Sequence, residues 1–429
     1  MKKKLLVIFM TVCLTVSLAA CGNSEKRDKK EANNETGISE EADTKTEEKA
    51  DVEEQSESQE QETANQNLNV DEDYANLPES QGFMFESKGD GTCTLTKIGD
   101  CTDSDIVIPE KSPEGDRVTM IAEQAFYGAK DINSIIFAGR SMELDKKAFQ
   151  SCEVKKIVIT GCDLVIGEYA FSYCDDISEV YISNSKIEFD SYSFFDTGKD
   201  ISVKIVNSNG ILDEKAFQAC AISSLMINDS TLELGKYVFA YCEDLTDVNV
   251  GASTVEIGSY AFFESCDDAT VTFSNCGLNM DEKAFQSCGL TALNISEGEM
   301  VMGDYAFAYC EDLKDLIIGV GNMKIGKYSF YQCTSLENVS LAAESEDDSL
   351  AILIEDKAFQ SSSVQKVIIG KGKVELGDNA FSYCEDLVSV EIKGKISDIG
   401  DYVFYECPAK LVISYNGGSY NKESIEEIK

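Results

Sequence analysis

The chain is organised around residues 235–245, which read GKYVFAYCEDL and are followed by the apolar pair Val248 and Val250. Nearly the same sequence returns at residues 303–313 and 377–387, and looser versions fill most of the chain, each anchored by one phenylalanine. The anchors are Phe126, Phe149, Phe171, Phe194, Phe217, Phe239, Phe262, Phe285, Phe307, Phe330, Phe359, Phe381 and Phe404. They are 22 or 23 residues apart, except for one step of 29. A fixed period in the twenties is typical of a solenoid.

Each repeat is expected to form one coil with three parts. A short segment of alternating apolar residues comes first, as at 232–234, and a tight turn follows it. Gly or Asp stands four residues before the phenylalanine, as at Gly167 and Asp145. Since these residues favour helix N-caps, a short helical or 3-10 turn carrying Ala-Phe is predicted. The last part, as at 245–250, alternates in polarity and fits a strand with one buried face.

Stacking these coils about 4.8 Å apart pairs their strands into parallel sheets. About 13 coils of 22–23 residues are predicted, each phenylalanine lying on that of the next coil. A slower period of 68 residues is also present, because every third coil has the same sequence type. One type carries KAFQ, one has x-Tyr-Cys after the phenylalanine, and one has a second aromatic residue there. The fourth copy contains six extra residues near 343–350, which form an acidic bulge. A three-coil unit was therefore duplicated as a block.

The composition excludes several classes of function. The chain contains no histidine, so a Ser-His-Asp triad, a Cys-His pair and a zinc site with histidine ligands are all excluded. The net charge of −41 argues against nucleic-acid binding, which needs Lys and Arg for the phosphates. No catalytic residue, metal site or cofactor is predicted.

The first 80 residues are expected to be an export signal and a tether. Residues 1–20 combine a basic start with an apolar segment at 5–18, as in a secretion signal. Residues 18–21, LAAC, resemble the bacterial lipoprotein box, which implies that Cys21 receives a diacylglyceryl group and anchors the protein to the membrane. The alternative is an ordinary cleaved signal. Residues 21–80 are acidic and contain one aromatic residue, Tyr74, so they are predicted to be a disordered tether; a calcium-binding or partner-binding tail is the alternative.

Caps are expected at both ends of the solenoid. Residues 81–118 contain short strand patterns with a turn at 89–91 and are predicted to cover the first coil. Cys93 and Cys101 lie eight residues apart across this predicted hairpin and are a candidate disulfide. The solenoid is placed at 119–413, and residues 414–429 are assigned to a C-terminal cap or tail.

Residues 166–174, IGEYAFSYC, and the equivalent positions of the other coils resemble the BspA-like class of bacterial leucine-rich repeats. The resemblance covers about 83–413. It implies a leucine-rich-repeat solenoid of the right-handed α/β superhelix class, β-rich with short helical or 3-10 turns. It also implies a cell-surface protein, since members include adhesins that bind host proteins. Several coils depart from the pattern, among them those with Thr197, Ser265 and Ser362 where the cysteine is expected.

Three sets of repeated residues are candidate sites. Nine cysteines stand three residues after their phenylalanine, and small buried thiols are favoured over metal ligands because no Cys-x-x-Cys pair occurs. Acidic pairs such as Glu243-Asp244 recur every third coil, and a solvated surface is favoured over cation binding or catalysis. The tyrosines before the cysteines recur with the same period and form either a contact stripe or a layer packed over the neighbouring coil. Strand residues pointing away from the core would line the concave face that such solenoids use for contacts. The candidates are Glu179, Tyr181, Lys204, Asp247, Asn249, Thr272, Asn294, Asp315, Asn338 and Glu391.

The sequence therefore predicts a non-enzymatic, lipid-anchored protein on the extracellular face of the membrane. Its repeats would bind another protein or a glycan, as an adhesin does. The alternative is a structural envelope or spacer protein with no specific ligand. An enzyme would need a cleft that interrupts the repeats, and only residues 345–348 interrupt them.

Overall fold

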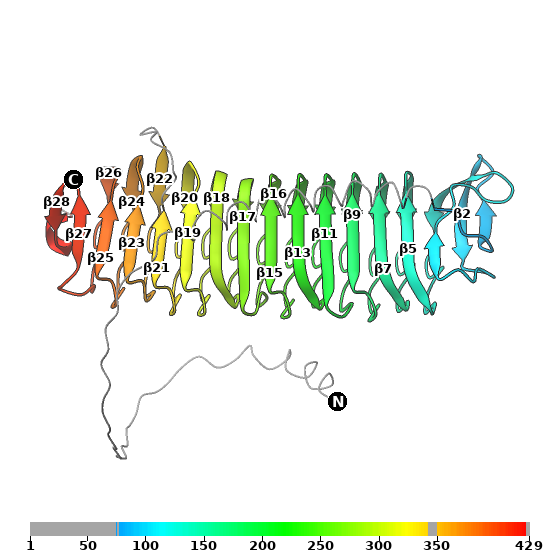
Figure 1. Cartoon of the computed structure of the whole chain (residues 1–429), viewed down its shortest axis with the longest axis horizontal. Coiled ribbons are helices and arrows are strands. Elements are labelled where there is room, and N and C mark those ends of the chain that lie inside the picture. Colours follow the sequence, from blue (N-terminus) through cyan, green and yellow to red (C-terminus); the bar gives the residue numbers. More distant parts are fainter. Residues whose placement is uncertain (1–73, 75–76, 342–349, 426–429) are drawn as a thin grey trace, which may run out of the picture. The chain divides into compact units, whose positions relative to one another are not determined.

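The computed structural model describes Tyr74, residues 77–341 and residues 350–425 of the chain. Strands lie side by side in one row, and each turn of the chain contributes two of them (Figure 1). They pair into two parallel ladders, in which every strand is hydrogen-bonded to the equivalent strand of the next coil. Two long strands, β17 and β18, run through both ladders and join them. This is the predicted solenoid.

The first ladder has fourteen strands. They are β3 (Asp105–Val107), β5 (Ile132–Ala138), β7 (Val154–Thr160), β9 (Glu179–Ser183), β11 (Ile201–Val206), β13 (Ile222–Asn228), β15 (Asp247–Gly251), β17 (Ala269–Met280), β18 (Leu290–Met302), β19 (Asp315–Gly319), β21 (Asn338–Leu341), β23 (Lys366–Ile369), β25 (Ser389–Ile392) and β27 (Val412–Tyr415).

The second ladder contains the shorter segments that precede each phenylalanine, together with the C-terminal halves of β17 and β18. Its other strands are β2 (Thr92–Lys97), β4 (Arg117–Ile121), β6 (Ser141–Leu144), β8 (Asp163–Ile166), β10 (Lys186–Phe189), β12 (Asn209–Leu212), β14 (Thr231–Leu234), β16 (Thr254–Ile257), β20 (Asn322–Ile325), β22 (Ala351–Ile354), β24 (Lys373–Leu376) and β26 (Lys395–Ile399).

The anchoring phenylalanines form one continuous column. All thirteen are buried, and the rings of successive coils stack with centroids 4.3–5.6 Å apart. The stack continues unbroken across the 29-residue step, where Phe330 and Phe359 lie 5.0 Å apart. Phe83 closes the N-terminal end with an edge-to-face contact on Phe126. The prediction of stacked rings, one from each coil, is confirmed.

The turn that carries each phenylalanine is not the predicted helical or 3-10 turn. In every coil the residues two before and two after the phenylalanine have positive φ, as do Lys147 (59°) and Ser151 (57°) around Phe149. These left-handed residues break any helix and make a chain of tight turns. Within them, Lys147, Phe149 and Ser151 donate backbone hydrogen bonds to the next coil, while the residues between them bond within their own turn. The coils are thus hydrogen-bonded to each other at the corner as well as in the ladders.

The glycine found four residues before the phenylalanine in several coils allows the coils to pack closely and does not cap a helix. A Cβ atom on Gly303 would lie 2.6–2.8 Å from backbone atoms of the preceding coil. Ordinary side chains do not fit so close to a neighbouring backbone, so glycine permits the tight stacking at this point.

A ladder of buried serines bends the chain between the two strands of a coil. Each serine accepts a hydrogen bond from the backbone N–H of its equivalent in the preceding coil and donates to the carbonyl two residues before itself. The members are Ser185, Ser208, Ser230 and Ser253. The hydroxyls satisfy backbone groups that the bend removes from the ladders.

Short additional elements lie at both ends of the described solenoid. The N-terminal cap is an antiparallel hairpin of β1 (Met84–Ser87) and β2 around the predicted turn at 89–91. At the other end, β28 (Gly418–Tyr420) pairs with β27, and the buried Ile425 of helix α2 (Lys422–Ile425) closes the core. The signal segment, Cys21, most of the tether and the acidic bulge at 343–349 lie outside the described residues.

Cys93 and Cys101 are both free thiols, so the candidate disulfide does not form. The hairpin pairs Cys93 with Ser87, and Cys101 lies beyond the far end of β2. The extended strand from Cys93 to Lys97 alone spans about 13 Å, whereas disulfides need Cα atoms within about 7 Å.

Candidate interaction surfaces

The outer face of the first ladder contains the predicted contact residues in two parallel rows. The strand register aligns Glu179, Asp247, Asp315 and Asn338 in one row. The second row lies two residues further along each strand. It contains Tyr181, Lys204, Asn249, Thr272, Asn294 and Glu391. Because side chains alternate across a strand, both rows point away from the phenylalanine column. The fold therefore brings together residues that are up to 212 positions apart in the sequence.

Exposure along these rows is uneven. Asp247, Asn249, Asp315, Asn338 and Glu391 are exposed, and Glu179, Lys204, Thr272 and Asn294 are half-buried. Tyr181 does not belong to an open contact face, since only 3% of it is exposed. It lies in an apolar cluster on the outside of β3, β5, β7 and β9, and Tyr74 packs against that cluster. The open part of the face therefore begins at β11.

The sequence reasoning missed three apolar residues on this open face. Met226, Ile317 and Ile368 occupy the same row as Lys204 and Asn249. Ile317 is 50% exposed. The sequence indicates this exposed residue through the uninterrupted apolar run Leu316-Ile317-Ile318, because strand alternation places a polar residue at the middle, outward position. Single exposed apolar side chains are common on protein surfaces, so these three residues do not by themselves mark a contact site.

A second surface, which we call the aromatic edge, follows the turns that carry the phenylalanine column. It has three full clusters and one partial cluster, one for each 68-residue unit. The clusters are Tyr169, Tyr173, Tyr192 and Phe195; Tyr237, Tyr241, Tyr260 and Phe263; Tyr305, Tyr309, Tyr328 and Tyr331; and Tyr383, Tyr402 and Tyr405. The predicted tyrosine stripe therefore packs over the neighbouring coil, and Tyr173 and Tyr383 still expose 43% and 44% of their surface.

A lysine from the next unit fastens each full cluster. Lys215, Lys283 and Lys357 donate hydrogen bonds of 2.9, 2.8 and 2.7 Å to the hydroxyls of Tyr192, Tyr260 and Tyr328, respectively. The hydrogen bond to Tyr260 raises the pKa of Lys283, and the bond to Tyr328 does the same for Lys357. The KAFQ lysines thus connect one three-coil unit to the next.

The repeat cysteines are structural donors inside the core. The thiol of Cys242 donates to the carbonyl oxygen of Phe217 in the preceding coil, with Sγ and O 3.3 Å apart, and most other repeat cysteines do the same. Thr197 replaces a cysteine and makes the equivalent bond with its hydroxyl, 2.9 Å from the oxygen of Phe171. Burial raises the pKa of Cys242 to about 12. Such thiols stay protonated at neutral pH and are poor nucleophiles.

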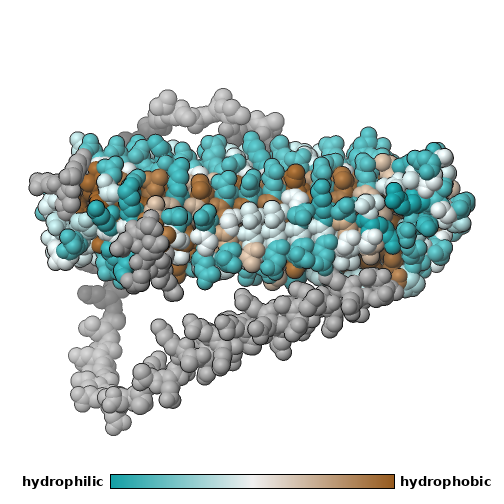
Figure 2. Space-filling model, turned by 90° about the horizontal axis from the view of Figure 1, so that it is seen from above, coloured by the Kyte–Doolittle hydropathy of each residue, from teal (hydrophilic) through white to brown (hydrophobic). Residues whose placement is uncertain are grey.

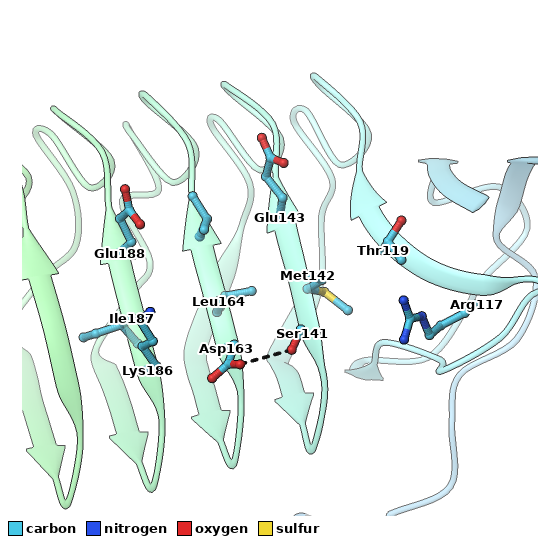
Figure 3. A pocket seen from close by; sticks show the side chains of 11 residues that line it. Arg117, Thr119, Ser141, Met142, Glu143, Asp163, Leu164, Lys186, Ile187 and Glu188 are labelled. Atoms are coloured by element: carbon cyan, nitrogen blue, oxygen red, sulfur yellow. Dashed lines mark hydrogen bonds between the residues drawn. The ribbon is translucent and has the colours of Figure 1, made fainter. Parts of the chain in front are cut away.

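A shallow groove of about 420 Å³ crosses the outer face of the second ladder at β4, β6, β8 and β10 (Figure 3). Glu143 and Glu188 point outward from equivalent positions of two coils, and Ser141 donates to Asp163 over 3.3 Å. The lining consists of repeated sheet positions, so the groove is part of the repeating face and not a separate cleft. Figure 2 shows hydrophobic residues in a broken band between hydrophilic rows along one side.

Neither a metal site nor a membrane-spanning helix is found among the residues that the structure describes. Among them, no group of three or more His, Cys, Asp or Glu side chains has the geometry of a metal site. In the same part of the chain, no helix is long and apolar enough to cross a membrane.

The chain is similar in structure to a leucine-rich repeat protein from Bacteroides ovatus, with a TM-score of 0.40 and 19% identity over 78% of this chain and 87% of that one. It is also similar to a leucine rich cell surface protein from Faecalibacterium prausnitzii, with a TM-score of 0.31 and 17% identity over 75% and 97% of the two chains. The pneumococcal vaccine antigen PcpA gives a TM-score of 0.27 and 15% identity over 79% and 93%.

A search of curated proteins found no match. The family model described as the BspA type Leucine rich repeat region matches residues 101–223, 165–291, 232–349 and 352–424, which together make up well over half of the chain. The repeats, the two ladders and this match agree, and the chain belongs to the family of BspA-type leucine-rich repeat proteins.

Proposed function

We propose that this protein is held at the cell surface by a lipid on Cys21 and binds a protein or glycan partner through the outer face of its first ladder, from β11 to β25. The observation that carries the proposal is the open, in-register pair of polar rows on that face. Equivalent strand positions recur at every coil, so a partner could contact side chains of several coils along the sheet. A non-enzymatic role is consistent with the protonated core thiols.

The anchor and the surface location rest on the sequence of residues 1–21. An apolar segment followed by LAAC is the substrate expected for lipid attachment. A Cys21→Ser variant should lose incorporation of a labelled fatty acid and should move from the membrane fraction to the soluble fraction. If this variant stays in the membrane fraction, the anchor proposal is wrong.

Partner binding is tested with the whole protein on an array of host proteins, matrix proteins and glycans. Any saturable interaction is then repeated with an Asn249→Arg/Asn294→Arg variant, which places two cations on the proposed face. The matched control is Glu256→Arg, on the outer side of the second ladder. We expect loss of binding for the first variant and no loss for the control. Absence of saturable binding to every class would favour the structural spacer.

A further inference from the structure

The apolar cluster on the outside of β3, β5, β7 and β9 is unusual for this ladder. Val107, Ile136, Val158 and Tyr181 are at most 4% exposed, although their side chains point away from the phenylalanine column. At the next strand the same row continues with the half-buried Lys204. Because the outer face of a one-sided sheet is normally polar, an apolar cluster here needs a cover.

The cover comes from the chain itself, just before the N-terminal cap. Tyr74 packs on the apolar cluster, and residues 77–81 continue toward the sheet edge. Lys156 lies 5.3 Å from the centre of the Tyr74 ring and 2.9 Å from a carboxylate oxygen of Glu179. We call Tyr74 and residues 77–81 the strap.

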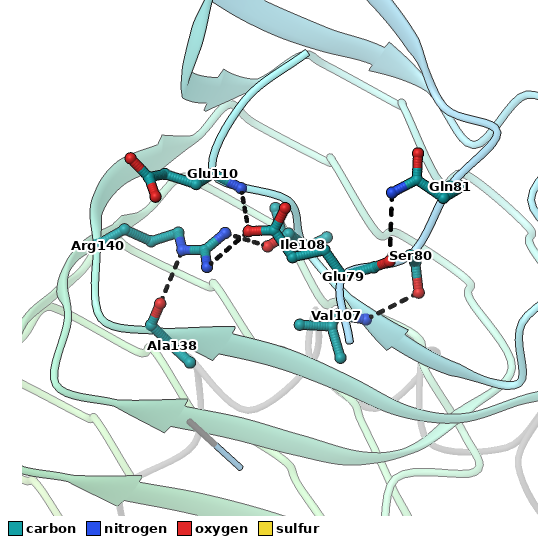
Figure 4. Close-up of polar contacts among 8 residues, drawn as sticks. All are labelled: Glu79, Ser80, Gln81, Val107, Ile108, Glu110, Ala138 and Arg140. Atoms are coloured by element: carbon teal, nitrogen blue, oxygen red, sulfur yellow. Dashed lines mark hydrogen bonds and ion pairs between the residues drawn. The ribbon is translucent and has the colours of Figure 1, made fainter. Parts of the chain in front are cut away.

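The strap pairs with the edge of the first ladder. Ser80 N–H donates to the carbonyl oxygen of Val107 over 3.0 Å, and the Val107 N–H donates to Ser80 Oγ over 3.1 Å (Figure 4). Both backbone groups of this β3 residue are thereby satisfied on the side away from β5. Addition of an extended segment to a sheet edge is a common way for proteins to bind peptides.

An ion pair holds the middle of the strap. Glu79 accepts hydrogen bonds from Glu110 N–H at 2.7 Å and from Arg140 at 3.2 Å. Arg140 is fixed in turn by donating to the carbonyl oxygens of Ala138 and Ile108 (Figure 4). Its side chain is only 17% exposed, so this ion pair is shielded more than an ordinary surface pair.

We infer that the outer face of β3, β5, β7 and β9 is a binding site for an extended peptide, and that its occupant is the chain's own strap, which can be released and replaced by the same segment supplied from outside. The strap contributes nothing to the phenylalanine column, so its release leaves the solenoid core intact. Tyr74 lies beside Lys156 of β7, on the same side of the sheet as the rows that begin at β11. The inference does not depend on partner binding by those rows.

The test uses the full chain in two forms. A released variant combines Tyr74→Ala, Glu79→Ala and Ser80→Pro, which removes the ring, the carboxylate and both groups that pair with Val107. The probe is a labelled synthetic peptide with the sequence of residues 70–82. In the unaltered protein the covalently attached strap competes at an effective concentration in the millimolar range. We therefore expect the released variant to bind the peptide at least tenfold more tightly than the unaltered protein.

A further substitution checks that the peptide occupies this site. Arg140→Ala in the released variant should weaken peptide binding by about tenfold or more, since it removes a charged hydrogen-bond partner. Lys204→Ala, one strand beyond the cluster, is the matched control and should change nothing. If the released variant binds the peptide no better than a scrambled peptide, the inference is overturned.

Hydrogen exchange gives a second readout without the peptide. Release of the strap should speed exchange of the Val107 amide strongly, whereas the Phe239 amide in the solenoid core should keep its protection. Unchanged protection of Val107 after release would also overturn the inference.

Discussion

Replacing one ring in the middle of the phenylalanine column should destabilise the solenoid strongly. Phe239 is fully buried and stacks on Phe217 at 5.4 Å and on Phe262 at 5.1 Å. Phe239→Ala removes the burial and leaves a cavity, at a cost of about 3–5 kcal/mol in the free energy of unfolding. Phe239→Leu keeps most of the apolar volume but loses two ring pairs worth about 0.5–1.5 kcal/mol each, so it should cost about 1–3 kcal/mol.

The assay is urea unfolding followed by circular dichroism, with the slope of each transition compared between variants to detect partial unfolding. Tyr127→Ala is the control, since this ring is 57% exposed at the first coil, and it should stay within about 0.5 kcal/mol of the unaltered protein. If Phe239→Ala costs less than about 1 kcal/mol, the column does not stabilise the fold as argued. Equal costs for alanine and leucine would show that ring stacking contributes nothing beyond volume.

Three further substitutions test other parts of the fold by the same urea assay. Cys242→Thr should be more stable than Cys242→Val, because threonine can still donate to the carbonyl oxygen of Phe217; equal stability of the two would contradict this role for the thiol. Gly303→Ala should destabilise by about 1–3 kcal/mol because its Cβ would collide with backbone, whereas Gly277→Ala, with 3.5 Å to its nearest neighbour, should be tolerated. Burial and neighbouring carboxylates raise the pKa of Asp190, so its ionised form disfavours folding at neutral pH. Asp190→Asn should therefore raise the free energy of unfolding at pH 7 by less than about 1 kcal/mol, and the gain should disappear as the pH falls below the carboxyl's ordinary pKa; a gain that persists in acid would contradict the electrostatic cause.

The coil architecture could be predicted because one residue type marks each turn of the solenoid. Phe126 to Phe404 recur at a nearly fixed spacing, and a repeated apolar residue that cannot be buried alone has to pack on its own copies. The strand register followed from the same spacing. The 29-residue step does not interrupt the phenylalanine column, because Phe330 and Phe359 still stack.

The corner geometry could not be predicted from residue preferences. Gly and Asp before the phenylalanine suggested a helix cap, but residues such as Tyr169 and Tyr173 adopt positive φ there, which non-glycine residues rarely do. The hydrogen bonds to the neighbouring coil stabilise this conformation, and they exist only after the coils have stacked. The ladder of buried serines was missed for the same reason.

The outward direction of the candidate contact residues followed from strand alternation, but the limits of the open face were not foreseen. Tyr181 follows the same alternation as Asn249, so the sequence pattern does not distinguish them. What separates the two is the strap, which folds back from more than a hundred residues earlier in the chain. Contacts between segments so far apart leave no local pattern in a single sequence.

The bridging lysines have a consequence for how the length of such a protein can change. Lys215 reaches back to Tyr192 of the preceding unit and also lies 6.0 Å from the ring centre of Tyr237 in its own unit, so it links the aromatic clusters of both units. Deleting or inserting 68 residues would keep an equivalent tyrosine beside every bridging lysine. Removing a single coil would instead place the lysine beside a coil of a different sequence type. Relatives that have grown or shrunk during evolution should therefore differ by multiples of three coils wherever these lysines are retained.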